Sequence, residues 1–373
     1  MHHHEFWWRF FPKKELTQIY LSSFIRSFAL SLISLFIPLY LHIEIGYTLH
    51  ETLYFFVFYA VMFAIFTPIA AKFAARFGLK HSILLSVPFY LLFILLLYLL
   101  PYYSIHSIFI SSLFGISQAF YWMGMHMVFH HASDHKHRGE EVGKRASFSI
   151  LAGLFGPLLG GFLVATFGFK IVFCLAAISL FLSAIVLFNS KEGHSPYHFS
   201  VRSVLNKDHW KDSLFFVSKG TMVMASGVLW PLFIFLILQS YLSLGIVGSI
   251  ISGTSALLLW LVGRYSDHIK KRLIIKLSTP IEALSWFLKS IVIVKWQVFA
   301  MTIFGALSHG IRESPLGALE YDKARGEIAA YFVSREVFIC LGRILLLMFV
   351  IMTNSLSGGL MFQGFASFVA LLF

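Results

Sequence analysis

Charged residues are scarce in this sequence: Asp, Glu, Lys and Arg together make up 12% of its 373 residues. A soluble domain carries about 25% charged residues, because its surface must be wetted by them. Hydrophobic residues instead make up 58% of the chain, 42 residues are phenylalanine, and the mean hydropathy is +0.80. The scarcity of charge therefore argues against an ordinary soluble domain and indicates a protein whose natural solvent is lipid.

Several other features are also missing. The only cysteines, Cys174 and Cys340, lie inside apolar runs, so no disulfide framework is expected. No phosphate-binding glycine-lysine loop occurs, which argues against ATP-driven pumping. No cleavable signal peptide is evident, and the aromatic and basic residues 1–15 predict an interfacial segment before the first span. The net charge of +12 does not indicate nucleic acid, since the basic residues fall in short loops and form no continuous stripe.

Long apolar runs predict an all-α membrane protein with twelve transmembrane helices. Most runs reach the roughly 20 residues that a helix needs to cross about 30 Å of hydrocarbon. The last run is short, because it stops at Phe373. The predicted spans are 16–42, 52–74, 81–101, 106–130, 146–167, 170–188, 213–239, 244–262, 273–293, 297–318, 329–353 and 358–373.

The distribution of Lys and Arg predicts the orientation of these spans. With the amino terminus in the cytoplasm, 21 of the 29 basic residues fall in cytoplasmic segments and helix ends. Only Lys170 and Lys295 fall on the opposite side, and the remaining six lie within spans. The positive-inside rule therefore places both termini in the cytoplasm, and we expect a multi-pass protein of the plasma membrane.

The chain divides into two related halves. Arg26 lies twelve residues before Pro38 in the first span, and Lys219 lies twelve before Pro231 in the seventh, an offset of 193. Duplicated halves place a binding site at their interface near mid-membrane, where rocking exposes it alternately to either side. The predicted divisions are a cytoplasmic interfacial amino terminus (1–15), a six-helix bundle (16–188), a cytoplasmic linker (189–212) and a second six-helix bundle (213–373).

Two loops resemble the signature of the major facilitator superfamily, which lies between its second and third and its eighth and ninth helices. Ala71 and Ala75 stand where the first-half signature has Gly and Asp. The resemblance covers the whole chain in span number, linker position and motif placement. It implies the fold of that superfamily, two bundles related by a pseudo-two-fold axis, with these loops latching the cytoplasmic side. The matching residues are Arg76, Gly78 and Lys80 in the first half and Gly263, Asp267, Lys271 and Arg272 in the second.

The fifth span contains a cluster of glycines around a proline. It resembles a GP-x-x-GG motif of the superfamily's antiporters. Small residues also let two helix backbones approach closely, and a proline bends a helix. A marker of transport mode and plain helix packing therefore both remain open. The residues are Gly153, Gly156, Pro157, Gly160 and Gly161.

Two cations lie about ten residues inside their spans, at equivalent places in the repeat: Arg26 and Lys219. A charge at mid-membrane costs about 2.5–3.5 kcal/mol on insertion scales, so each is a functional candidate. Two cations facing one cavity repel unless an anion lies between them, which predicts an anionic substrate. Alternatively each cation pairs with an acid from another helix or extends toward the cytoplasmic interface. Because Glu282, Glu313 and Glu336 all belong to the second half, Arg26 is the preferred substrate contact.

Two polar stripes are predicted to face the central cavity. In the fourth span Gln118, Trp122, His126 and His130 recur every four residues. In the tenth span Thr302, His309 and Glu313 share a helical face, and Arg312 precedes Glu313. We expect substrate contacts from Gln118, Trp122, His126, His309 and Arg312, and proton coupling from Glu313, Glu282 and Glu336.

A purely structural role is the alternative for these residues. His126 and His130 are suited to interhelical hydrogen bonds, and Glu313 with Arg312 or Glu336 with Arg343 to structural ion pairs. The histidines also resemble a di-iron histidine box, since imidazoles at i and i+4 can share a metal. Such enzymes need several boxes and no second one occurs. The residues of this box are His126, His130, His131, Asp134, His135 and His137.

These observations favour a secondary transporter that works by alternating access and is not an enzyme. The leading hypothesis is proton-coupled efflux or antiport of small amphipathic compounds. The alternative is uptake or exchange of an organic anion bearing a phosphate or carboxylate. A membrane metalloenzyme and a non-transporting scaffold or receptor are more remote. We expect a monomer in the lipid bilayer, with a small-molecule substrate, protons as partners and no cofactor.

Overall fold

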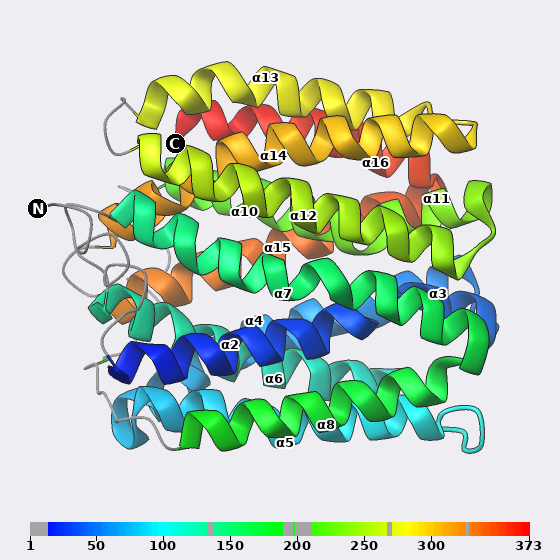
Figure 1. The fold of residues 1–373 in the computed structure, drawn as a ribbon, viewed down its shortest axis with the longest axis horizontal. Helices are drawn as coiled ribbons and strands as arrows, with labels where there is room; N and C mark the ends of the chain where they lie inside the picture. The colour runs from blue at the N-terminus through cyan, green and yellow to red at the C-terminus, as the bar shows by residue number, and fades with distance from the viewer. Residues whose placement is uncertain (1–13, 133–137, 189–196, 198–209, 267–270, 325–327) are drawn as a thin grey trace, which may run out of the picture.

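The computed structural model describes residues 14–373 apart from 133–137, 189–196, 198–209, 267–270 and 325–327. All regular elements in these residues are helical (Figure 1). They coincide with the twelve predicted spans, which confirms an all-α membrane fold. The elements are α2 (Lys14–Ile33), α3 (Ile37–Leu39), η1 (Tyr40–Glu44), α4 (Leu49–Phe77), α5 (Leu79–Leu99), α6 (Ser107–Ala132), α7 (Arg138–Phe167), α8 (Phe169–Phe188), α10 (Trp210–Met224), η3 (Ala225–Leu229), α11 (Trp230–Leu238), α12 (Tyr241–Ser266), α13 (Lys271–Ser290), α14 (Lys295–Lys323), α15 (Ile328–Thr353), α16 (Leu356–Ser367) and η4 (Phe368–Leu372).

Eight helices in the described residues are long and apolar enough to be recognised as membrane spans by composition alone. The other four predicted spans correspond to α7, α13, α14 and the pair α16–η4. In α13 and α14 the hydropathy is lowered by buried charges, among them Glu282, Lys289 and Arg312. Charged residues inside a membrane bundle face other helices, so these two helices are candidates to carry the function.

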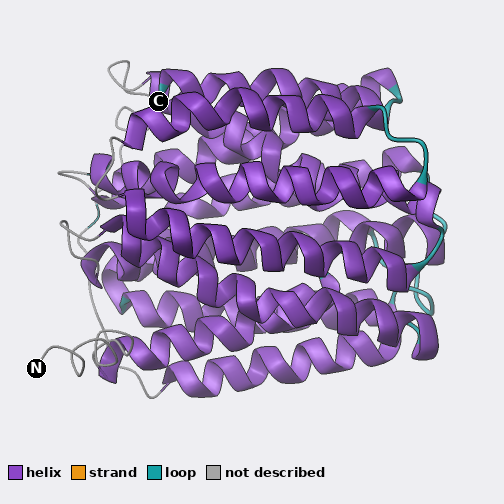
Figure 2. Ribbon diagram, turned by 45° about the horizontal axis from the view of Figure 1, so that its top comes forward, coloured by secondary structure: helices purple, strands orange, loops and turns teal. Residues whose placement is uncertain are grey.

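The helices run roughly side by side along the long axis of the molecule (Figures 1 and 2). The start of α2 and the chain end Phe373 lie at the same end, on the left in Figure 1. We call this the terminal end. Of the predicted linker 189–212, most residues lie outside those described, and α10 begins at Trp210.

Two equivalent spans are broken at their prolines. Pro38 lies in α3, after a turn that interrupts the first span, and Pro231 is the second residue of α11, which follows the π-helical turn η3. Proline has no N–H to donate to the preceding turn, so the helix must change its hydrogen bonding there. Such π-helical turns often occur at functional sites. Arg26 and Lys219 both lie before these breaks, each on the terminal-end part of its span.

Helices from the two sequence halves pack directly on each other. α7 lies against α12, where the Ser249 hydroxyl donates to the carbonyl of Leu154 (2.5 Å). α15 lies against α4 and α6. Polar side chains on α4, α6, α14 and α15 also connect the two halves.

Candidate functional site

Arg26 is buried in α2, with 2% of its surface exposed. One guanidinium nitrogen donates to the Ser86 hydroxyl on α5 (3.3 Å). The guanidinium lies 3.9 Å from the ring centre of Tyr121 on α6 and 5.6 Å from that of Tyr90 on α5. Its Nε and its other terminal nitrogen have no hydrogen-bond partner, and no carboxylate among the described residues pairs with it. A buried cation without an anion is costly, so this arrangement is suited to an anionic ligand.

Lys219 is equivalent to Arg26 in the repeat but has acidic partners. Its ammonium on α10 lies 3.0 Å from a carboxylate oxygen of Glu313 and also contacts the carboxylate of Glu320, both on α14. Of the two alternatives stated for these cations, pairing with an acid describes Lys219. The two halves therefore differ in the acidic partners at these equivalent positions, and within the described residues Arg26 pairs with no carboxylate.

The carboxylate of Glu320 extends the pairing from α14 to α15. Arg335 donates through Nε to Glu320 (2.8 Å), and a terminal nitrogen contacts Glu336. All three side chains are at most 10% exposed. With Lys219 and Glu313 they form what we call the central network. Its two cations face three carboxylates, so the ionised network lacks one positive charge.

His126 connects this network to the first half of the chain. Its Nε2 lies 3.0 Å from Oε1 of Glu336 and 3.1 Å from a terminal nitrogen of Arg335. Its Nδ1 lies 2.8 Å from the Tyr321 hydroxyl on α14. The imidazole is 2% exposed and stacks on Phe332 (4.9 Å between ring centres). A proton on His126 would supply the missing charge of the central network.

The remaining members of the fourth-span stripe contact each other. Trp122 donates through Nε1 to the side-chain oxygen of Gln118 (3.1 Å), and its ring stacks on that of His126 (5.3 Å). Tyr121 contacts the Trp122 ring (5.3 Å) and also the guanidinium of Arg26. A chain of aromatic contacts therefore joins Arg26 to His126.

A second polar cluster lies between α13 and α14. Arg312 pairs with Glu282 (3.1 Å), and His309 lies 3.6 Å from the same oxygen. The suggested pairing of Arg312 with its neighbour Glu313 is not what the structure contains, because successive helix residues point in different directions. Glu282 and Arg312 are buried, whereas His309 is about one-third exposed.

Arg343 on α15 is the second buried arginine without a carboxylate partner in the described part of the chain. It donates to the Tyr59 hydroxyl on α4 (3.1 Å) and lies 4.8 Å from the Phe63 ring centre. Its Nε has no partner. The suggested Glu336–Arg343 pair is not formed, because Glu336 instead contacts Arg335 and His126.

Aromatic rings separate the two unpaired arginines. Tyr90, which lies under Arg26, contacts Phe114 (5.6 Å), and Phe114 stacks on Tyr59 (4.3 Å), the partner of Arg343. The arginines thus approach from α2 and α15, one from each half, toward the same group of rings on α4, α5 and α6.

The predicted histidine box does not act as one unit in the described residues. His126 contacts Glu336 and Tyr321, whereas His130 contacts the carbonyl of Ala324 (3.1 Å). The imidazole of His131 and residues 133–137, with Asp134, His135 and His137, lie outside the side chains that are described.

The loop-motif residues contact their own halves. Gly78 has φ of +107° between α4 and α5, a conformation that favours glycine. Lys80 donates to the Phe188 carbonyl (2.8 Å), and Arg76 lies near the Phe77 ring. In the second half Lys271 pairs with Asp322 (3.0 Å). Asp267 and the surroundings of Gly263 lie outside what is described.

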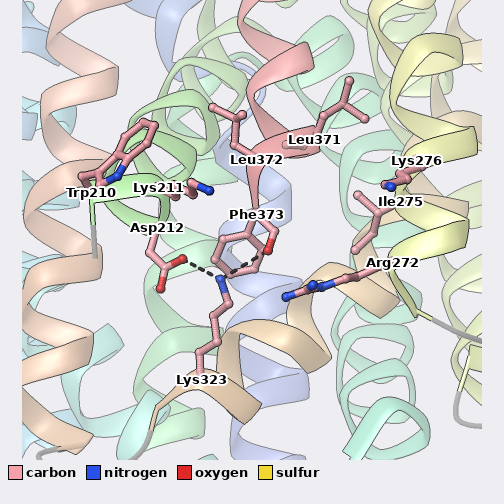
Figure 3. A pocket seen from close by; sticks show the side chains of 11 residues that line it. Trp210, Lys211, Asp212, Arg272, Ile275, Lys276, Lys323, Leu371, Leu372 and Phe373 are labelled. Atoms are coloured by element: carbon pink, nitrogen blue, oxygen red, sulfur yellow. Dashed lines mark hydrogen bonds and ion pairs between the residues drawn. The ribbon is translucent and has the colours of Figure 1, made fainter. Parts of the chain in front are cut away.

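A pocket of about 640 Å³ lies at the terminal end (Figure 3). Lys323 there pairs with Asp212 (2.5 Å) and lies over the Phe373 ring, and Arg272 of the loop motif faces the same space. This pocket shares no residue with the central network or the Arg26 surroundings. Its lining residues are Trp210, Lys211, Asp212, Arg272, Ile275, Lys276, Lys323, Ala370, Leu371, Leu372 and Phe373.

The glycines of the fifth-span motif lie where α7 meets α2 and α12. A Cβ on Gly161 would lie 2.5 Å from the Tyr241 carbonyl, and one on Gly156 or Gly160 would overlap atoms of Ser31 or Leu32. Gly153 has more room. Pro157 lies inside α7 and packs against Gly245 and Gly248 of α12. Gly161 and Pro157 thus allow close packing between the halves, whereas Gly156 and Gly160 allow close packing of α7 on α2 within the first half.

We expect Gly161→Ala to destabilise the protein by about 1–3 kcal/mol, because the added methyl group overpacks the α7–α12 contact. Thermal unfolding in detergent, followed by tryptophan fluorescence, measures the change. Gly227→Ala is the matched control, since a Cβ there meets nothing within 4 Å. Equal melting temperatures for both variants would contradict the packing role.

Three residues of the candidate site are not found by the sequence argument: Glu320, Tyr321 and Arg335. The predicted tenth span ends at residue 318, whereas α14 continues to Lys323 and carries Glu320 and Tyr321 into the bundle. A signal was present, because Glu320 lies seven residues after Glu313 and thus on the same helical face.

The comparisons with known proteins agree with this architecture. The family model described as Major Facilitator Superfamily matches residues 19–347. The protein YqgE of Bacillus subtilis (strain 168), described as uncharacterized, is 25% identical over 257 residues, which cover 64% of this chain and 59% of that protein.

Two solved structures have a similar fold. The human organic anion transporter MFSD10 (TETRAN) superposes with a TM-score of 0.68 at 11% identity, covering 96% of this chain and 99% of that one. The E. coli fucose:proton symporter FucP gives a TM-score of 0.68 at 10% identity, covering 95% of this chain and 97% of that one. At these identities the likeness shows the fold alone.

Proposed function

Since this chain belongs to the Major Facilitator Superfamily, we propose that it moves a small organic anion across a membrane by alternating access, coupled to protons. The observation that carries the anion is Arg26, a buried guanidinium with two unpaired nitrogens and no paired carboxylate among the residues that the structure describes. Guanidinium groups bind carboxylate and phosphate through parallel hydrogen bonds, which these nitrogens are free to donate. The solved organic anion transporter of the same fold is consistent with this chemistry.

Arg343 supports the same substrate class from the other half. A ligand that contacts arginines on α2 and α15 together is held by both halves, so its binding depends on their relative position. The intervening rings of Tyr90, Phe114 and Tyr59 favour a substrate with an apolar or flat body beside its acidic group. Gln118 and Trp122 are the proposed contacts on α6.

The proposed proton carrier is the central network with His126. Neutral imidazole accepts a hydrogen bond from Arg335 at Nε2, whereas imidazolium donates from Nε2 to Glu336. Either form keeps Nδ1 close to Tyr321. Because His126 belongs to the first half and Glu336 to the second, its protonation strengthens a contact between halves. Glu313 and Lys219 are proposed to belong to this coupling system rather than to the substrate site.

We also propose an orientation, a membrane and an oligomeric state for this protein. The distribution of basic residues supports a cytoplasmic location for the terminal end, in the plasma membrane, and a monomer contains both proposed sites. His126, Glu336 and Tyr321 then lie toward the cytoplasmic side, where they hold the two halves together. Lys271, Arg272, Arg76 and the other loop-motif residues are proposed to limit the movement at that side.

Proton-coupled efflux of amphipathic compounds is the second candidate. The rings of Tyr121 and Trp122 between Arg26 and His126 favour it, because aromatic surface binds apolar solutes. The glycines around Pro157 in α7 are compatible with either direction of transport. The two candidates differ in the charge of the substrate, which a binding assay distinguishes.

The test is a thermal-shift screen of the purified protein with carboxylates and sugar phosphates, each paired with its neutral ester or parent sugar. We expect stabilisation by acids and not by their neutral partners, since a ligand that binds only the native state raises its melting temperature. Arg26→Gln should weaken binding of a hit at least tenfold, because a hydrogen bond to a charged group contributes about 1.5–3 kcal/mol. Lys72→Gln, at an exposed basic position without a proposed role, is the control. Unchanged affinity in Arg26→Gln would overturn the anion site, and preference for neutral or cationic amphiphiles would favour efflux.

A further inference from the structure

The pocket at the terminal end belongs to neither the proposed substrate site nor the central network (Figure 3). Its volume of about 640 Å³ falls within the range of about 300–1,000 Å³ that is usual for small-molecule sites. It is lined by the start of α10, the first turns of α13, the last residue of α14, and η4 with Phe373. All of these segments belong to the second half of the chain, so a ligand in the pocket would join several helix ends of one bundle.

The inner wall of the pocket is formed by packed apolar side chains. The Phe373 ring stacks on that of Phe215, with 4.1 Å between ring centres. Ile275 and Ala370, which also line the pocket, belong to the same buried cluster. Closely packed side chains hold one arrangement, so this wall exists before any ligand binds.

Basic side chains outnumber acidic ones in the pocket lining. Lys323 pairs with Asp212 (2.5 Å). The other three cations pair with no carboxylate in the part of the chain that the structure describes: Lys211, Arg272 and Lys276. Four cations against Asp212 and a carboxylate at the chain end would still leave an excess of two positive charges. A concave site with an excess of one charge sign attracts a ligand of the opposite sign.

The cations of the pocket approach one space from different helices. Figure 3 shows the guanidinium of Arg272 on α13 directed across the pocket toward the ammonium of Lys323 on α14. Like charges that face each other repel unless an anion lies between them. Lys276 lies one turn after Arg272 on α13, and Lys211 lies in the first turn of α10. Such a group of separate donors suits an anion with several oxygens, such as a phosphate.

The pocket also has an apolar rim. Trp210, Leu371 and Leu372 line it and are exposed. In a protein that spans a membrane, exposed apolar side chains contact lipid, and tryptophan at the end of a span lies at the level of the lipid headgroups. The rim therefore places the opening of the pocket at the surface of the bilayer. A soluble phosphate compound makes no use of such a rim, whereas the acyl chains of a phospholipid pack against it.

We propose that this pocket binds the phosphate headgroup of an anionic phospholipid. Lys211, Arg272 and Lys276 donate to the phosphate oxygens, and Trp210 contacts the upper part of the acyl chains. Basic pockets at the membrane surface select anionic lipids, because the choline cation of a zwitterionic lipid adds to the positive charge already present. The bound lipid connects α10 to α13 and stabilises the second half of the chain. The site is independent of Arg26 and of the proposed substrate.

The experiment is native mass spectrometry of the purified full chain, titrated in detergent with phosphatidylglycerol or with phosphatidylcholine. We expect the wild type to bind one phosphatidylglycerol at least tenfold more tightly than phosphatidylcholine. Lys276→Glu should lose most of this preference, since it replaces an attraction by a repulsion. Lys72→Glu is the matched control, because it changes the net charge equally at an exposed lysine of α4. Equal affinity of the wild type for the two lipids, or equal losses in Lys276→Glu and Lys72→Glu, would overturn the proposal.

Two further arms identify the source of the phosphate and separate this site from the substrate site. Inorganic phosphate and glycerol 3-phosphate are added to the lipid-free protein, against sodium chloride at equal ionic strength. We expect neither to raise the melting temperature in a way that depends on Lys276. A saturable rise that is lost in Lys276→Glu and kept in Lys72→Glu would overturn a lipid as the ligand. Arg26→Gln should keep the preference for phosphatidylglycerol, so failure of the proposed function is distinguishable from failure of this site. Lys211→Glu, on α10, repeats the test if Lys276→Glu does not fold.

Discussion

Glu320→Gln is expected to be among the most destabilising single substitutions in the chain. The carboxylate of Glu320 is shared between Lys219 and Arg335, all on buried side chains. Removing one partner of a buried ion pair costs about 3–5 kcal/mol, and here two buried cations each lose one of their two carboxylate contacts. The expected fall in melting temperature is roughly 10 °C, at about 2–4 °C per kcal/mol.

Glu313→Gln is the matched comparison on the same helical face. Glu313 pairs only with Lys219, and its side chain is 25% exposed, against 2% for Glu320. Solvent compensates part of the lost charge there, so we expect a loss several-fold smaller. If the two substitutions lowered the melting temperature equally, burial would not be what gives Glu320 its importance.

A double substitution tests the charge balance of the central network. Glu320→Gln leaves Lys219 with Glu313 and Arg335 with Glu336, so the excess negative charge of the network disappears. Combining Glu320→Gln with Lys219→Met restores the original excess of negative charge in the network. It also removes one of the two cations that lost the Glu320 carboxylate. Because these residues touch, their effects should not add, and the double variant should be more stable than the sum predicts. Additive losses would mean that Lys219 and Glu320 act independently.

The sequence predicted the architecture more completely than the site. Long apolar runs and the repeated Arg26–Pro38 and Lys219–Pro231 spacing can be read from the sequence alone, so the twelve spans and the equivalence of the first and seventh could be predicted, whereas the breaks in these two spans were not. The depth of Arg26 also follows from its place within a span. No local sequence pattern shows which residue a charged side chain pairs with. Lys219 and Arg26 occupy equivalent places in the repeat, yet of these two Lys219 is the one that lies near α14 carboxylates.

The other differences between the predicted and the observed site concern which residues the charged side chains pair with. Arg312 and Glu313 are neighbours in sequence but point to α13 and α10 respectively, since successive helix residues are about 100° apart. Glu336 is contacted by Arg335 from the same helix and by His126 from the other half. These choices depend on helix rotation and on which helices meet, and both are set by the packing of the whole bundle.

His126→Gln is expected to abolish coupling between transport and the proton gradient. The glutamine keeps a polar group at this position but cannot gain a charge between pH 5 and 8, as an imidazole with an ordinary pKa of about 6.5 does. In the proposed coupling, a proton bound to wild-type His126 turns its Nε2 from an acceptor of Arg335 into a donor to Glu336 and strengthens the contact between α6 and α15. Lower pH should therefore favour the conformation in which the halves touch at the terminal end.

The measurement is uptake or release of the identified substrate in proteoliposomes with and without a pH gradient. In the wild type, a pH gradient should drive accumulation of the substrate against its own concentration gradient. In His126→Gln we expect accumulation to fall at least tenfold while exchange of internal for external substrate persists, because the Arg26 surroundings are intact. His130→Gln, one turn further along α6 at a contact with the Ala324 carbonyl, should retain coupling. If His126→Gln responded to the gradient as the wild type does, another residue would have to carry the coupled proton. Loss of exchange as well would indicate that His126 is needed for substrate binding or for the movement of the two halves.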